Sequence, residues 1–214
     1  GSIVRKVGTY WQNDRQARLV KILEAVLANA DMATHTATVA EDDILGNLLE
    51  QLATVFGQNR NQVRALVMDT LTAVKYEKIG LLEFRKYNDA NGVERNTNIA
   101  DLLGFTVVVD DTAMTDKAGT IYALGAGAII TAKPKVKVPV ELERDAKKNG
   151  GETHLITRVR DVLHPNGFTV TKPSSTEVSP TDEFLADSAN YALELPEKSI
   201  MIAKFTIGAA DVTG

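Results

Sequence analysis

Apolar residues recur at spacings of three and four from about Val7 to Ala30, which predicts a long amphipathic helix. Its polar face carries Asp14, Arg18 and Lys21. Its apolar face consists of Leu19, Val20, Leu23, Val26, Leu27 and Ala30. Trp11 is expected to be a packing anchor in this helix, because large aromatic side chains mainly supply buried area. Residues 31–40 are rich in threonine and lack a helical period, so they predict a connector.

Two shorter helices are predicted next. Residues 44–56 repeat the helical pattern and stop at Gly57. The acidic residues 41–43 before them are interpreted as an N-terminal cap, because three consecutive carboxylates supply too few spaced oxygen ligands for a divalent cation. Asp69 is expected to cap a third helix that ends at Gly80. The expected apolar positions of that helix are Leu71, Val74 and Ile79.

The central stretch, residues 98–130, is hydrophobic and punctuated by glycine. Within it, Phe105–Val109 and Thr120–Leu124 are rich in strand-favouring residues and are bounded by Gly and Asp, so they predict buried strands. Val63–Met68 predicts a further short strand before the third helix. Residues 88–92 predict a turn, because Asn and Gly tolerate a positive φ.

Alternating apolar and polar residues over 135–142 predict a half-exposed strand, in which Pro139 marks an edge or a bulge. On such a strand Lys133, Lys135 and Lys137 would share one face, available to phosphate, to an acidic neighbouring subunit or simply to solvent. A long extended run is expected over residues 153–163, followed by a turn over residues 164–167.

The chain should end with a short helix and a strand. Ser179 and Pro180 are the expected cap and first residue of this helix, with Phe184, Leu185 and Ala189 on its buried side. Residues 200–207 predict the final strand. Helices come early and strands late, without regular alternation of strand and helix, so the predicted fold class is α+β.

Composition limits the possible functions. The chain has 214 residues, of which 44% are hydrophobic, enough for one sizeable core with a distinct subdomain. The net charge of −4 gives no polycationic signal for nucleic acid. The absence of cysteine excludes disulfides and thiolate metal sites. No apolar run approaches the length of a membrane span, and no signal peptide is visible. Gly1 and Ser2 are interpreted as the remnant of a tag.

The search for catalytic motifs finds little. Gly125 and Gly127 form a GxG pattern without the third glycine or a following helix, which argues against a dinucleotide site. The three histidines are scattered and predict no metal site, and no cofactor is expected. Adjacent strand residues such as Asp110 and Asp111 point to opposite faces. An enzyme would need these two carboxylates and His164 to converge in one pocket, so this class is kept only as an alternative.

Six segments, in this order along the chain, resemble segments of a known protein family. They are YWQNDRQARLVKILEAVLANA (10–30), VRALVMDTLTAVKYEKIGLL (63–82), LLGFTVVVDDTAM (102–114), YALGAGAI (122–129), VELERDAKKNGGETHLITRVRDVLHPNGF (140–168) and SPTDEFLADSANYALELPEKSIMIAKF (179–205). Together they resemble the major capsid proteins of tailed bacteriophages and prophages, which have the Hong-Kong-97-type fold. The resemblance covers nearly the whole chain.

The resemblance implies a division into two domains. Residues 5–33 and 132–175 would form a peripheral domain, with the first helix as its long spine helix beside a β-sheet. Residues 34–131 and 176–207 would form a mixed α/β axial domain. Arg158 and Arg160, together with Lys133, Lys135 and Lys137, become candidate intersubunit contacts, although the two arginines could equally face solvent.

The implied function is structural. Copies of such a protein would assemble as pentamers and hexamers into an icosahedral head around the DNA genome, which they contact only non-specifically. Scaffold, portal and decoration proteins are possible partners, and assembly would take place in the bacterial cytoplasm before the protein resides in the virion. An alternative of the same fold is the shell protein of an encapsulin-like nanocompartment. The amino-terminal arm and extended loop of the family have no counterpart here, so the isolated chain is expected to be a monomer or a loose small oligomer.

Overall fold

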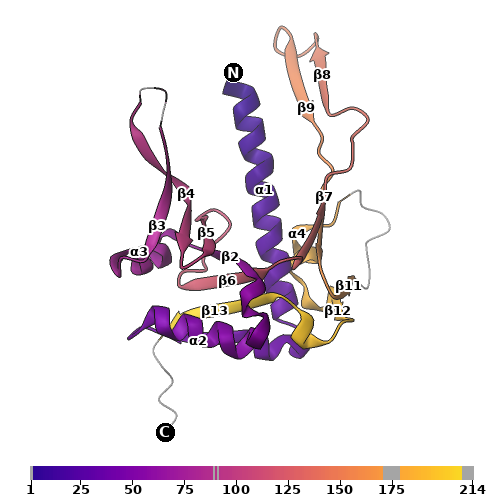
Figure 1. Ribbon diagram of the computed structural model, residues 1–214. Coiled ribbons are helices and arrows are strands. Elements are labelled where there is room, and N and C mark those ends of the chain that lie inside the picture. Colours follow the sequence, from indigo (N-terminus) through magenta and orange to yellow (C-terminus); the bar gives the residue numbers. More distant parts are fainter. Residues whose placement is uncertain (1, 89, 91, 171–178, 209–214) are drawn as a thin grey trace.

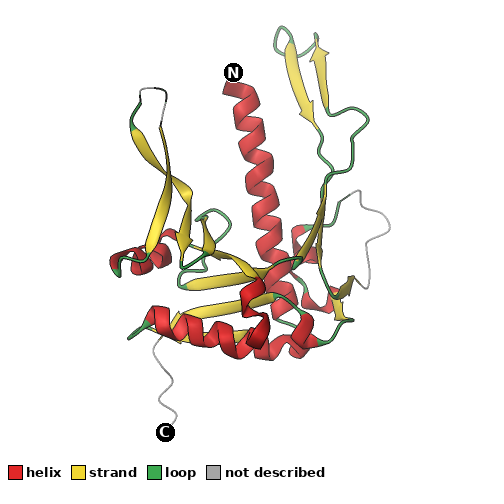
Figure 2. Cartoon of the chain, in the orientation of Figure 1, coloured by secondary structure: helices red, strands yellow, loops and turns green. Residues whose placement is uncertain are grey.

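The computed structural model describes residues 2–88, 90, 92–170 and 179–208 (Figure 1). The α-helices of this part are α1 (Ser2–Leu27), α2 (Ile44–Phe56), α3 (Thr70–Lys78) and α4 (Asp182–Ala186), and 3₁₀ turns occupy Ala30–His35, Gly57–Gln62, Ser188–Asn190 and Glu197–Ser199. The strands are β1 (Thr36–Ala40), β2 (Val63–Met68), β3 (Leu82–Asn88), β4 (Glu94–Leu102), β5 (Phe105–Val109), β6 (Thr120–Gly125), β7 (Ile129–Ala132), β8 (Val140–Asp145), β9 (Glu152–Thr157), β10 (Val162–Pro165), β11 (Phe168–Val170), β12 (Tyr191–Leu193) and β13 (Ile202–Gly208). This mixture confirms the predicted α+β class (Figure 2).

In the described part of the chain, a seven-stranded sheet has the order β1-β13-β6-β2-β5-β4-β3. β1 runs parallel to β13 and β2 runs parallel to β5, whereas the other neighbours are antiparallel. The remaining strands pair two by two, as β7 with β10, β8 with β9, and β11 with β12. The two strands predicted in the central stretch, β5 and β6, therefore lie inside the large sheet.

Helices cover both faces of this sheet near β13. Figure 1 shows α2 on one side and α1 rising from the other. Alternation along β13 directs Phe205 and Lys204 to opposite faces. Phe205 is fully buried, whereas the ammonium of Lys204 lies 3.6 Å from the Glu24 carboxylate of α1. The carboxyl-terminal half of α1 is therefore the part of this helix that packs on the sheet.

Several segments extend away from this packed base. The amino-terminal half of α1, the β3–β4 hairpin and the β8–β9 hairpin all project on the same side of the sheet (Figure 1). The α1 residues Ile3, Val4 and Tyr10 are exposed. These projections leave large apolar side chains in contact with water.

Of the first two helices, α2 matches its prediction and α1 does not. α2 has the predicted bounds, and the Asp43 carboxylate accepts a hydrogen bond from the Gly46 amide (2.9 Å), which confirms the cap interpretation of the acidic run. α1 begins at Ser2 and ends at Leu27, before the predicted end. Asn29 has an extended backbone, and its side chain caps the following 3₁₀ turn, so the helix cannot continue to Ala30.

The prediction of a connector over residues 31–40 is wrong. Ala30–His35 forms a 3₁₀ turn, and Thr36–Ala40 is strand β1. β1 pairs with β13, which lies far away in the sequence. The local sequence of a threonine-rich segment does not predict pairing with a strand so distant in the chain.

The third helix exists, but its predicted buried face is wrong. Leu71 is 70% exposed and Ile79 is 47% exposed, whereas Thr72, Ala73 and Tyr76 are buried. Asp69 occupies the N-cap position without capping through its side chain, which accepts a hydrogen bond from the Thr72 hydroxyl. The Thr70 amide donates instead to Asp111 (2.7 Å). A residue distant in the sequence thus supplies the cap.

The predictions of two long extended segments in the later part of the chain are also wrong in part. β8 begins only at Val140, so residues 133–139 have no strand partner in the described structure. The run over residues 153–163 is divided into β9 and β10 by the irregular residues 158–161. His164 and Pro165 belong to β10, which leaves Asn166 and Gly167 as the turn.

The carboxyl-terminal helix starts later than predicted. Its cap is Thr181, whose hydroxyl accepts a hydrogen bond from the Phe184 amide, and not Ser179. Leu185 is buried as predicted, but Ala189 lies beyond the helix and is exposed. The final strand, β13, is shifted by one or two residues. The predicted turn at 88–92 includes positions 89 and 91, which lie outside the described residues.

Candidate interaction surfaces

An irregular segment, which we call the neck, joins the β7–β10 pair to the β8–β9 hairpin. It consists of residues 133–139 and 158–161. The Arg158 amide donates to the carbonyl oxygen of Pro139 (2.9 Å), which links the two halves. Proline at positions 134 and 139 removes backbone donors and restricts ladder formation in this segment. The hairpin is therefore attached through backbone that lacks a continuous β-ladder.

The five predicted contact residues all lie in the neck and are exposed: Lys133, Lys135, Lys137, Arg158 and Arg160. The prediction that they share strand faces is wrong, because neither half of the neck is a strand. The Arg158 guanidinium lies 2.9 Å from the Glu141 carboxylate at the start of β8. The structure thus gathers these cations in one segment without arranging them on a regular face.

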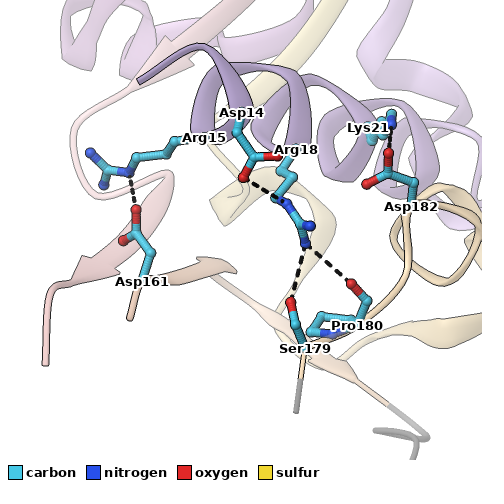
Figure 3. A network of polar contacts seen from close by, with 8 residues as sticks. All are labelled: Asp14, Arg15, Arg18, Lys21, Asp161, Ser179, Pro180 and Asp182. Carbon is cyan, nitrogen blue, oxygen red and sulfur yellow. Dashed lines mark hydrogen bonds and ion pairs between the residues drawn. The ribbon is translucent and has the colours of Figure 1, made fainter. Parts of the chain in front are cut away.

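One side of α1 makes a row of polar contacts with the neck and with the segment around α4 (Figure 3). Arg15 Nε lies 2.6 Å from Asp161 Oδ2, as an ion pair whose N–H is not aligned for a hydrogen bond. Arg18 contacts Asp14 (3.0 Å), the Ser179 hydroxyl (3.4 Å) and the Pro180 carbonyl (3.1 Å). The helical spacing of these side chains places them on one face of α1.

The row continues toward the sheet with Lys21. Its ammonium lies 2.5 Å from the Asp182 carboxylate in the first turn of α4 (Figure 3). This hydrogen bond and the nearby charges of Lys21 and Arg18 hold the pKa of Asp182 below its usual value, against the opposing effect of partial burial. The polar face of the predicted amphipathic helix therefore contacts other segments of the protein.

A hollow of about 360 Å³ lies beside this row. Its walls combine apolar and charged side chains from α1, the neck, β10 and the residues before α4. They are Trp11, Asp14, Arg15, Arg18, Ile22, Val159, Asp161, Val162, Leu163, His164, Ser179, Pro180 and Leu185. The indole N–H of Trp11 donates to the Thr157 hydroxyl (3.2 Å) at the end of β9. Trp11 is half-buried, so it anchors the hairpin to α1, as a packing role predicts.

The β8–β9 hairpin is amphipathic. Pairing of Val140 with Thr157 and of Leu142 with Leu155 places these side chains on one face, because partners in an antiparallel pair point to the same side. Leu142 is 70% exposed and Leu155 is 43% exposed. The opposite face carries Glu141, Glu143, Asp145, Glu152, His154 and Ile156. Since Thr157 touches Trp11, the apolar face of the hairpin is the one turned toward α1.

A charged cluster fixes α1 to the sheet. The Glu24 carboxylate accepts hydrogen bonds from the Lys117 ammonium (2.5 Å) and the Tyr122 hydroxyl (2.9 Å), and Lys204 lies 3.6 Å away. Burial alone would raise the pKa of Glu24 above 4.5, but these hydrogen bonds and the two lysine charges hold it below that value. Burial and the nearby carboxylate raise the pKa of Tyr122. The cluster is a structural joint between α1, β6 and β13.

The structure separates the three side chains of the enzyme alternative. Asp110 accepts hydrogen bonds from the Thr112 and Ala113 amides, and Asp111 accepts two from Thr70 at the start of α3. The backbone hydrogen bond from Thr70 is the main reason that the pKa of Asp111 is lowered. His164 lies in β10 and lines the hollow beside α1. The two carboxylates act as caps, and the proposed pocket does not form.

The described part of the chain holds no group of three or more acidic or histidine side chains placed to bind a metal ion. None of its helices combines the length and the apolar character needed to cross a membrane.

Comparison with known proteins finds a relative of known role. No protein-family model matches the chain. The chain is 29% identical over 213 residues to the major capsid protein of Bacillus phage SPP1. The chain is a relative of a phage major capsid protein. The match covers 95% of the chain and 64% of that capsid protein, and it confirms the resemblance predicted from the sequence.

Sequence reasoning missed several contact residues of this capsid-protein relative. Arg15 was not singled out, and Arg18 and Lys21 were placed on the polar face of the helix without any partner, although all three contact distant segments. Their spacing along α1 marks a second functional face, but the sequence does not show what covers it. Leu142 was placed on the apolar side of a half-exposed strand and Leu155 in an extended run, and both are exposed.

Proposed function

We propose that the chain is a structural subunit of a phage head, which self-assembles into an icosahedral shell around the DNA genome. The observation that carries this proposal is the 29% identity to a phage major capsid protein across 95% of the chain. Exposed apolar surface on the projections supports the same function, because large exposed patches mark interaction sites. Repeated contacts between copies would perform this function without covalent chemistry.

The proposed fold is of the Hong-Kong-97 type, with the domains predicted from the sequence. α1, the neck and the strands from β8 to β11 would belong to the peripheral domain of residues 5–33 and 132–175. The large sheet with α2, α3 and α4 would belong to the axial domain of residues 34–131 and 176–207. Contacts of Trp11 with Thr157 and of Arg15 with Asp161 support the grouping of α1 with the hairpin. Residues 171–178, at the junction of these ranges, lie outside the described residues.

The exposed cations of the neck are proposed as intersubunit contacts. Lys133, Lys135, Lys137 and Arg160 could each meet a carboxylate of a neighbouring copy, whereas Arg158 would first have to exchange Glu141 for an external partner. Other copies in pentamers and hexamers would be the main partners. Scaffold, portal and decoration proteins, together with non-specific contacts to DNA, complete the proposed set, with assembly in the bacterial cytoplasm and residence in the virion.

Electron microscopy and light scattering of the purified chain test self-assembly. The chain is examined over increasing concentration, salt and crowding agent, with small oligomers up to capsomer-sized rings as the expected products. A variant with Lys133, Lys135 and Lys137 changed to Glu tests the neck, and Lys198→Glu serves as an exposed control. A chain that stays monomeric under every condition would contradict self-assembly by these residues.

A further inference from the structure

At one end of the large sheet, the ends of four neighbouring strands lie side by side. Ala65 of β2 pairs with Thr106 of β5, so Arg64 lies level with Phe105. Phe105 of β5 pairs with Leu102 of β4. Leu102 in turn pairs with Leu82 of the edge strand β3. From the interior of the sheet to its edge, this end therefore presents β2, β5, the β4–β5 turn and β3 in order.

The β4–β5 turn in the middle of this end is strained and apolar. Leu103 has a φ of +47° and Gly104 a φ of +89°. Two-residue turns of this kind favour Asn followed by Gly, because a bulky side chain is disfavoured at positive φ. Leu103 is nevertheless 54% exposed, so its side chain does not gain full burial in return. Strain at an exposed apolar residue suggests a contact outside the chain.

A groove of about 410 Å³ lies on the interior side of this turn. Its apolar surface comes from α2, β2 and β5, and its charged residues are Arg60 and Arg64. The full lining is Leu49, Leu52, Arg60, Asn61, Val63, Arg64, Leu103, Gly104 and Phe105. Residues 57–64 contain these two arginines and no acidic residue. We call this surface the basic groove.

The outer side of the turn is apolar and acidic. Leu81 precedes Leu82, the partner of Leu102, so Leu81 and Leu103 follow the same end of the β3–β4 ladder. Leu81 and Ile79 are exposed apolar residues. Residues 77–83 also carry Glu77, Glu83 and a single lysine, Lys78. We call residues 77–83 the acidic edge.

The charged groups of both surfaces lack ion-pair partners within the described residues. Arg60, Arg64, Glu77 and Glu83 are exposed and form no salt bridge there. By contrast, nearby Lys75 pairs with Glu41 and Arg85 pairs with Asp101. The unpaired charges thus flank the apolar turn with opposite signs on its two sides.

We propose that the basic groove binds the acidic edge of a second copy of this chain in a head-to-tail contact. Exposed leucines and Ile79 supply the apolar centre of the contact, and Glu77 and Glu83 of one copy face Arg60 and Arg64 of the next. Because the two surfaces differ, the contact is heterologous and generates a ring when the rotation closes. This inference rests on the proposed function and adds one pair of association surfaces to the cations of the neck.

Charge reversal tests the pairing by sedimentation at low ionic strength. Arg60→Glu with Arg64→Glu, or Glu77→Arg with Glu83→Arg, should each weaken self-association by about tenfold or more, because like charges then face each other. The four changes combined restore opposite charges and should return association to within about threefold of the parent chain. Lys198→Glu, at an exposed position on a 3₁₀ turn, is the control. Unchanged association in both double variants, or additive weakening in the combined variant, would overturn the pairing.

Cysteine cross-linking provides a second test that does not depend on charge reversal. The chain contains no cysteine, so introduced thiols report only the chosen positions. A mixture of Arg60→Cys and Glu77→Cys chains should form a disulfide-linked dimer at least about tenfold faster than a mixture of Arg60→Cys and Lys198→Cys chains, because bound surfaces raise the local thiol concentration. Equal rates would overturn the head-to-tail contact. A parent chain that associates without this cross-link leaves the proposed function intact, whereas a parent chain that never associates contradicts both.

Discussion

The packed base and the β8–β9 hairpin use leucine in opposite ways. In the base, Leu23 of α1 and Leu66 of β2 are fully buried between the sheet and its helices. In the hairpin, Leu142 and Leu155 pair across the strands and remain largely exposed. A two-stranded hairpin is at most marginally stable in water without packing against further strands or a helix. The base is therefore stabilised within the chain, whereas the hairpin leaves apolar surface in contact with water.

The largest effect is expected when a leucine is truncated in each of the two regions. Leu23→Ala should lower the free energy of unfolding by about 2–5 kcal/mol, because it leaves a cavity under α1 that the rigid core cannot fill. Leu142→Ala, the matched control, should change it by less than about 0.5 kcal/mol. Denaturant unfolding followed by circular dichroism measures both. Similar losses in the two variants would show that the hairpin is part of the core.

Glycine substitutions sharpen the comparison at two turns. A Cβ at Gly167 (φ +89°) would lie 2.3 Å from Cδ1 of the buried Ile200, so Gly167→Ala should cost about 2 kcal/mol through backbone strain and overpacking. Gly150, at the hairpin tip, has a similar φ of +78° and open space around it. Gly150→Ala strains only the hairpin, which can open without unfolding the base. Its effect on global unfolding should stay below about 0.5 kcal/mol, and an equal effect would remove the distinction.

The sequence predicted the packed base better than the β8–β9 hairpin and its neck. The α2 and β5 segments were predicted correctly, because their apolar residues follow one period and are buried by neighbouring elements. Alternation over residues 135–142 gave the same signal as a half-buried strand, yet residues 133–139 form no strand and Leu142 has no intramolecular cover. A sequence pattern shows that apolar residues share a face, and it does not show whether other residues of the same chain cover that face.

For the candidate surfaces, the sequence predicted some of the residues involved but not their arrangement in space. The lysines and arginines of the neck were identified, but their geometry depended on a strand that does not form. The row from Arg15 to Lys21 was missed, because its partners Asp161 and Asp182 lie more than a hundred residues away. Such contacts depend on tertiary placement, which helical spacing alone does not specify.

A smaller effect concerns the joint between α1 and the sheet. Glu24→Gln should lower the free energy of unfolding at pH 7 by about 1–2 kcal/mol, because it weakens hydrogen bonds to Lys117 and Tyr122. The folded pKa of Glu24 lies below its ordinary value of 4.5, so its contribution is complete above that value and is lost as pH falls through the folded pKa. Stability of the parent should therefore fall below about pH 5, and less steeply in the variant.

Exposed Glu183 provides the control for this pH dependence. Glu183→Gln should leave both the stability at pH 7 and its dependence on pH close to those of the parent, because Glu183 forms no salt bridge within the described residues. Identical pH profiles for the parent and Glu24→Gln would show that the Glu24 cluster does not stabilise the joint.

The smallest expected effect lies where the two regions meet. Thr157→Val removes the acceptor for the Trp11 indole N–H while keeping the size of the side chain. Water can replace this acceptor at the half-exposed Trp11, so the free energy of unfolding should change by less than about 1 kcal/mol. Trp11 is the only tryptophan, so the fluorescence reports the surroundings of this one side chain. The emission should shift, and hairpin amides should exchange faster with deuterium, because the hairpin loses its anchor on α1.

Thr153→Val is the matched control, because Thr153 lies on the same hairpin face nearer the tip. It should alter neither the emission of Trp11 nor amide exchange at the base of the hairpin. If Thr157→Val also leaves both unchanged, the hydrogen bond does not hold the hairpin, and the contacts of Arg15 with Asp161 must set its position alone. If amide exchange rises while global stability stays constant, the hairpin moves as a unit separate from the base. The hairpin can then change its orientation while the base stays folded.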